Sequence, residues 1–195
     1  MAAKQTRNRT DRPNPDHPDT DRPHHALFER LGVRAAAAAD TQIFIYSVKI
    51  VCGRQSEGHC CCPAGTRPGV YATEVNIQNI SLSPAPVVKA LMPLINMGAV
   101  VGREPDFTEL ADAKLDVITL PPLAATMDDC CRITELQLGA PANGDTQLTV
   151  AILTIVSLAE LTVSAVYTAT PLNGDGISID VEYILPRRLG RGNPG

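Results

Sequence analysis

The chain has no tryptophan, and aromatic residues make up only 4% of its 195 residues, although apolar residues make up 44%. A core must therefore be built mainly from Val, Ile, Leu and Ala. The longest apolar run, around Leu148–Val156, is interrupted by Thr and is too short to cross a bilayer. No basic N-terminal segment leads into an apolar run of the signal-peptide kind. We expect no membrane span, with the cytoplasm as the default compartment and an extracellular or surface location left open.

Motifs that carry common chemistries are missing as well. The sequence contains no G-x-S-x-G elbow and no Gly-rich phosphate-binding run. Three of the four histidines fall within the first 25 residues, in a polar stretch where nothing can orient them, and only His59 remains. Asp128 and Asp129 are adjacent, but neighbouring residues on a helix point in different directions. The sequence therefore predicts a protein that is not an enzyme and has no catalytic residues.

Charge is distributed unevenly around a formal net charge of −4. Residues 41–185 hold seven basic and fifteen acidic side chains, whereas residues 1–40 hold seven basic and six acidic ones. Because nucleic-acid affinity comes from neutralising phosphates with Lys and Arg, such a body would repel a polyanion. We expect no nucleic-acid partner.

Composition divides the chain into three parts. Residues 1–40 begin with a stretch rich in Arg, Asp, Asn and Pro that cannot bury enough apolar area to fold alone. They are predicted to be a disordered arm, or one that becomes ordered on a partner, and residues 25–39 are either a short helix or a linker. Residues 41–185 are predicted to be one β-sandwich domain, and residues 186–195 a flexible basic tail.

Two-residue periodicity predicts most of the domain to be strands. In TQIFIYSVKIVC, one face carries Phe44, Tyr46, Val48, Ile50 and Cys52. Further strands are expected in VYATEVNIQN and at 86–95, 116–120, 147–157, 160–170 and 176–185, with Pro93 at an edge or a bulge.

Turn chemistry sets the expected connections. SLAE and PLNGDG are predicted hairpins, and one short helix is expected after Thr126 as its cap. The fold class is therefore predicted to be all-β, an antiparallel sandwich of about seven strands.

Cysteines form the one chemical cluster above background. The residues that could ligate Zn²⁺ or Cu⁺ are Cys52, His59, Cys60, Cys62, Cys130 and Cys131, with Cys61 beside them. The spacing lacks the repeated Cys-x₂-Cys pair of common zinc sites, so two alternatives stay open: buried thiols, and disulfides between the segments. A reactive thiolate at Cys130 or Cys131 is disfavoured by the neighbouring aspartates. No cofactor is expected, with Zn or Cu as the alternative.

Five strings carry a resemblance, namely YSVKIVCG, PGVYATEVNIQN, ATMDDCCRI, ELTVSAVYTA and SIDVEYI. Together they resemble an uncharacterised family of small bacterial β-rich proteins in which these blocks occur in the same order. The strand pattern ending in ELTVSAVYTA is also similar to the sensory rhodopsin transducer family, which implies small oligomeric β-sandwiches that bind partners.

Three functions follow from these patterns as hypotheses. The leading one is a structural or partner-binding sandwich that self-associates into a homo-oligomer or larger assembly through its open sheet edges, with the arm either contributing or having no role. The alternative is a thiol-based metal or redox sensor using the Cys60–Cys62 loop and Cys130–Cys131. A third is small-ligand binding between the sheets.

Overall fold

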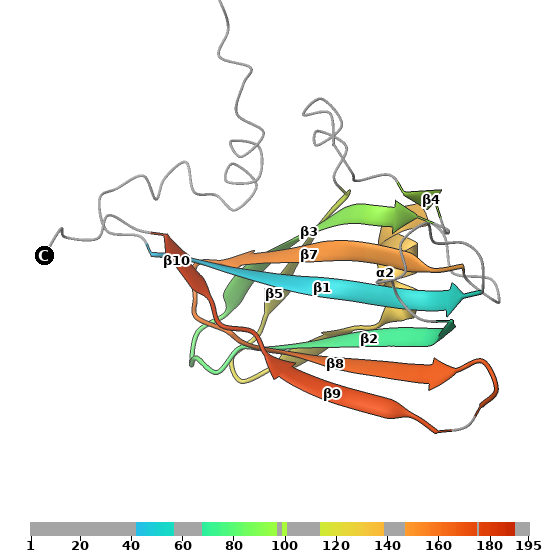
Figure 1. The fold of residues 1–195 in the computed structure, drawn as a ribbon. Coiled ribbons are helices and arrows are strands. Elements are labelled where there is room, and N and C mark those ends of the chain that lie inside the picture. Colours follow the sequence, from blue (N-terminus) through green and yellow to red (C-terminus); the bar gives the residue numbers. More distant parts are fainter. Residues whose placement is uncertain are drawn as a thin grey trace, which may run out of the picture.

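The computed structural model describes residues 42–56, 68–96, 99–100, 114–138, 147–174 and 176–189 (Figure 1). The arm predicted for residues 1–40 lies outside this part of the chain. The elements are β1 (Ile43–Gln55), β2 (Gly69–Gln78), β3 (Ala85–Asn96), β4 (Ala99–Val100), β5 (Lys114–Leu120), β6 (Ala125–Asp128), α2 (Cys130–Leu138), β7 (Thr149–Ser157), β8 (Thr162–Pro171), β9 (Ser178–Tyr183) and β10 (Arg187–Leu189). No helix among these residues is long and apolar enough to cross a membrane.

The antiparallel β-rich class predicted from the sequence is confirmed. The strands are ordered β4-β3-β7-β1-β2-β8-β9, with β5 on β3, β6 on β2 and β10 on β1, and every one of these pairs is antiparallel. The described residues contain more strands than the expected seven because β4, β6 and β10 are short pieces that periodicity does not detect. The predicted bulge at Pro93 is present as a register shift between Pro93 and Ile95.

Strand β1 joins the two halves of the sheet, one that contains β4, β3 and β7 and one that contains β2, β8 and β9 (Figure 1). It pairs with β7 as far as Cys52 and with β2 from Gly53 onward. Gly53 has a φ of 98°, a left-handed value that glycine adopts at little cost, at the point where β1 changes partner. The two halves are therefore continuous through one strand.

The core lies between these halves and is made of the predicted inward faces. Its fully buried side chains come from both halves and from the helix, and include Val48, Ile50, Val75, Ile77, Ile133, Leu153 and Ile155. All five residues predicted to share one face of β1 are buried. The face assignment from two-residue periodicity is therefore confirmed for this strand.

Two predicted local structures are wrong. SLAE does not close a hairpin, because β7 pairs with β1 and β3 while β8 pairs with β2 and β9, so the short connection passes from one half of the sheet to the other. Thr126 does not cap the helix but lies in β6. Asp129 is the cap instead, since its Oδ1 accepts a 2.8 Å hydrogen bond from the Arg132 backbone N–H.

The predicted flexible tail is also partly ordered. Arg187–Leu189 pair with the start of β1 as β10. The Arg188 guanidinium lies 5.7 Å from the centroid of the Phe44 ring and forms a 2.9 Å ion pair with Glu160. These contacts give residues 187–189 partners that the sequence pattern did not indicate.

Candidate functional site

The cysteines divide into three groups. Cys52 on β1 and Cys130 at the start of α2 form a disulfide across a sequence separation of 78 residues. This is one of the arrangements that the sequence left open. Cys131 is free and exposed. Cys60, Cys61, Cys62 and His59 lie outside the described residues.

The disulfide bears directly on the predicted metal site. A sulfur atom joined to another sulfur is not a thiolate, and thiolates are the ligands that Zn²⁺ and Cu⁺ require. Cys52 and Cys130 are therefore not available as ligands in this structure. Within the described ranges, no group of three or more His, Cys, Asp or Glu side chains could hold a metal. A metal site that includes His59, Cys60 and Cys62 stays a prediction.

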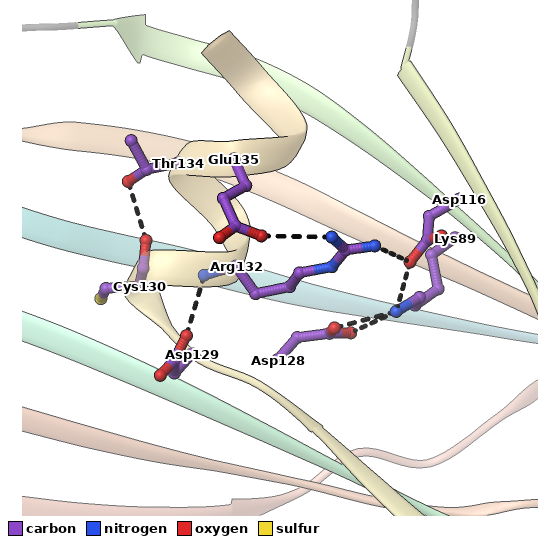
Figure 2. Close-up of polar contacts among 8 residues, drawn as sticks. All are labelled: Lys89, Asp116, Asp128, Asp129, Cys130, Arg132, Thr134 and Glu135. Atoms are coloured by element: carbon purple, nitrogen blue, oxygen red, sulfur yellow. Dashed lines mark hydrogen bonds and ion pairs between the residues drawn. The ribbon is translucent and has the colours of Figure 1, made fainter. Parts of the chain in front are cut away.

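A buried lysine is the centre of a second cluster, which the sequence analysis missed (Figure 2). Lys89 lies on β3 with a side chain only 3% exposed. Its Nζ lies 2.7 Å from Asp116 Oδ2 on β5 and donates to both oxygens of Asp128 on β6, at 2.8 and 3.1 Å. Lys89 shares its face of β3 with the core residues Val87 and Leu91. We name Lys89, Asp116, Asp128 and Arg132 the lysine cluster.

Helix α2 completes the lysine cluster from one side. Arg132 donates from Nη2 to Asp116 Oδ2 at 3.1 Å and from Nη1 to Glu135 Oε2 at 3.2 Å. Burial raises the pKa of the Asp116 carboxyl, but hydrogen bonds from Lys89 and Arg132 outweigh it and bring the pKa below its usual value. Asp116 is therefore held as a carboxylate between two cations.

Strand β9 is the last strand of the sheet path, and no strand among the described residues pairs with its outer edge (Figure 1). The Ile184 N–H donates to the Val163 carbonyl at 2.9 Å, so these two residues form a hydrogen-bonded pair of the β8–β9 ladder. Because hydrogen-bonded pairs alternate in an antiparallel ladder, the backbone groups of Ile179, Val181 and Tyr183 point to the open edge. The Val181 N–H is consistent with this pattern, because it donates to a side-chain oxygen of its neighbour, Asp180 Oδ1, at 3.0 Å.

The same three residues present an apolar surface. Ile179, Val181 and Tyr183 are 62%, 55% and 74% exposed. They lie opposite Thr168, Val166 and Ser164 of β8, and this face of β8 points away from the core formed by Val163 and Ala165. All six residues of β9 are exposed, so neither face of this strand is buried. We name Ile179, Val181 and Tyr183 the β9 edge.

The opposite face of β9 is acidic. Ser178, Asp180 and Glu182 alternate with the residues of the β9 edge. Glu182 accepts a 3.3 Å hydrogen bond from the Tyr167 hydroxyl. Burial, followed by the Glu182 charge, raises the pKa of Tyr167 to about 12. The strand therefore has an apolar face and a negatively charged face, and both are exposed.

A hollow of about 490 Å³ lies where β2 begins, β8 ends and β9 begins. Its lining includes Tyr71, Pro171 and Ile177. It lies beside the β8–β9 turn and not between the two halves of the sheet. It therefore does not correspond to the ligand site that the sequence left open.

Comparisons with known proteins identify no family. No family model and no curated protein matches the chain. Among solved structures, the chain is similar to a protein described as "Crystal Structure of Thermotoga maritima 1070", with a TM-score of 0.41 and 7% identity, covering 75% of this chain and 94% of that one. The similarity is too low to carry an argument, so the chemistry of the described residues has to support any function.

Proposed function

We propose that this chain is a non-enzymatic binding protein that self-associates, with the β9 edge of one copy receiving the N-terminal arm of another. One observation carries the proposal: the exposed apolar side chains and the outward-pointing backbone groups belong to the same residues, Ile179, Val181 and Tyr183. A strand added to such an edge gains main-chain hydrogen bonds, while its alternate side chains provide specificity. An open apolar edge with no partner is an aggregation hazard, which favours a dedicated partner.

The charges on β9 select the kind of strand that can be added. Asp180 and Glu182 occupy the positions between the apolar residues. A second copy of β9, added antiparallel about Val181, would place Asp180 opposite the Glu182 of the other copy. Like charges directly opposite each other destabilise a strand pair. The partner strand should therefore be basic where β9 is acidic.

The N-terminal arm contains a segment with this pattern. Residues 30–34 read R-L-G-V-R, so that Leu31 and Val33 would share one face of a strand and the two arginines the other. Paired with the β9 edge, the apolar face meets Ile179 and Val181, and the arginines meet the acidic face. This assigns a role to the arm and leaves a short helix over residues 25–39 as the competing structure.

The first test is the mass of the native protein in solution. We expect the full chain to be an oligomer and a chain lacking residues 1–40 to be a monomer. Val181→Pro should also give a monomer, because proline removes an N–H that points to the open edge and leaves the ladder to β8 intact. Val181→Thr keeps that N–H and a branched side chain, so it should remain an oligomer. A monomeric full chain, or an oligomer that survives the deletion, contradicts the proposal.

Charge reversal gives a second, independent test. Arg30→Glu with Arg34→Glu should dissociate the oligomer, and adding Asp180→Lys and Glu182→Lys should restore it. Arg7→Glu with Arg9→Glu is the matched control, since it changes the same charge elsewhere in the arm and should have no effect. Failure of the four-site variant to reassociate would show that the two segments do not meet.

A second candidate function is thiol–disulfide chemistry, which the Cys52–Cys130 disulfide beside the exposed Cys131 favours. Reducing that disulfide would take two electrons and two protons from a dithiol. Thiol counting before and after reduction, with elemental analysis for zinc and copper, tests this function. Of the compartments left open by the sequence, the disulfide favours an oxidising one, such as the cell surface, over the cytoplasm.

A further inference from the structure

The lysine cluster places a buried amine against two carboxylates on separate strands. Lys89 Nζ lies 2.7 Å from Asp116 Oδ2 and 2.8 Å from Asp128 Oδ1. The side chains of Lys89 and Asp128 are 3% and 2% exposed. Taking such charges out of water is costly, and a hydrophobic packing of the same volume is often at least as stable. The arrangement therefore calls for a reason beyond stability.

We propose that Lys89 and Asp116 condense into an intramolecular amide that cross-links β3 to β5. Lys89 Nζ attacks Asp116 Cγ, the new Nζ–Cγ bond replaces a Cγ–O bond, and that oxygen leaves as water with two protons from the ammonium group. The reaction joins a cation and an anion into a neutral amide plus water, so atoms and charge balance and no oxidant or activating nucleotide is needed. This inference is independent of the self-association proposal.

The geometry gives the neighbouring residues separate roles. Both carboxylate oxygens of Asp128 accept from Lys89 Nζ, which places Nζ near the plane of that carboxylate. A nucleophile has to approach a carboxyl carbon from above or below this plane, so Nζ is not placed to attack Asp128 Cγ. Asp128 therefore acts as the base that takes the proton and passes it to the leaving oxygen. Asp116 is held through one oxygen, to which Arg132 also donates at 3.1 Å. Arg132 stabilises the negative charge that develops on Asp116 during attack.

Proximity makes the condensation feasible although amide formation is unfavourable between free solutes in water. Groups fixed in contact react with effective molarities of about 10⁵–10⁸ M. Burial excludes the water that would reverse the reaction. Because the Lys89 nitrogen must release a proton before it can attack, we expect a slow reaction that completes after folding.

The test is the intact mass of the purified full chain, reduced and denatured. We expect a loss of one water molecule relative to the sequence, and a tryptic peptide in which Lys89 is uncleaved and joined to the Asp116 peptide. Lys89→Arg keeps a cation in place and should abolish the loss. Asp116→Asn should lose ammonia in place of water, a signature that a merely structural ion pair cannot produce. Asp128→Asn should slow the loss, because the base is gone.

Peptide sequencing also excludes another source of the same mass change. Succinimide formation at the Asp175–Gly176 pair would release water too, but it would leave Lys89 cleavable by trypsin. A full-length mass equal to the sequence after prolonged incubation of the folded protein would overturn the proposal. A protein that has lost water but is still cleaved by trypsin at Lys89 would overturn it as well.

Discussion

The Tyr46 hydroxyl and the Leu161 backbone exchange two hydrogen bonds although the residues lie 115 positions apart in the chain. The hydroxyl donates to the Leu161 carbonyl at 2.9 Å and accepts from the Leu161 N–H at 2.7 Å. Tyr46 is fully buried on β1, and Leu161 immediately precedes β8. One side chain thus satisfies both backbone groups of a residue that enters the other half of the sheet.

Tyr46→Phe should lower the free energy of unfolding by about 1–3 kcal/mol, because it leaves a buried N–H and a buried carbonyl without a partner. Urea denaturation followed by circular dichroism measures the change. Tyr183→Phe removes the same hydroxyl from a side chain that is 74% exposed and should change stability by less than about 0.5 kcal/mol. Equal effects of the two variants would contradict the role of the Tyr46 hydroxyl.

Compared with wild-type protein that carries no Lys89–Asp116 cross-link, Lys89→Met should be more damaging, at about 3–5 kcal/mol, because removing one partner of a buried ion pair leaves uncompensated charge. Adding Asp128→Asn should recover part of this loss, since Asp128 has no cation other than Lys89 among its described contacts. Chemical denaturation of both variants measures the effect. Lys49→Met on the exposed face of β1 is the control, and a Lys89→Met protein as stable as that control would contradict the prediction.

Tyr167 should ionise later than an exposed tyrosine as pH rises, with a pKa of about 12. Because this value is above the unfolded pKa of about 10, the stabilisation is fully present below pH 10 and is lost as pH rises through the folded pKa. Glu182→Gln should lower the pKa of Tyr167 only partly, since burial is the larger cause. Tyrosinate absorbance, with Tyr167→Phe subtracted, measures the shift, and an unchanged titration in Glu182→Gln would contradict it.

Replacing both Cys52 and Cys130 by Ser should cost about 2–5 kcal/mol, as expected for removing a disulfide that restricts the unfolded chain. Thermal unfolding with and without a reductant measures the loss, and reductant should have little further effect on the double variant. Cys131→Ser should be nearly neutral because Cys131 is exposed and free. A double variant that unfolds at the wild-type temperature would argue against this disulfide in the folded protein.

The strands could be predicted because their periodicity reports a physical constraint. Where one face of a strand packs on the core, as at Val48 and Ile50, alternate residues must be apolar, and the sequence shows it. Pairing partners are not encoded in this local signal. SLAE is short enough for a hairpin, yet the strands on either side of it pair with other strands. Likewise, Thr126 and Asp129 are both capping residues, and only the pairing of β6 with β2 decides between them.

The candidate sites were harder to predict than the strands. Lys89 interrupts the apolar run PVVKALM, and a lone lysine in such a run was the available signal. Its partners Asp116 and Asp128 are distant in sequence and meet it only through β5 and β6. The β9 edge has the same alternation as the buried strands, so its exposure could not be distinguished by pattern. β9 is exposed because it is the last strand of the sheet path, and its place in the sheet cannot be read from the alternation of its residues.

The bond between Cys52 and Cys130 closes β2, β3, β4, β5 and β6 into a covalent ring that starts on β1 and ends at α2. A protease that cuts the backbone once inside this ring would not release a fragment. The nicked chain would keep its full-length mobility on a denaturing gel until a reductant separated the two pieces. The ring thus allows the domain to survive a cut with all its strands still attached.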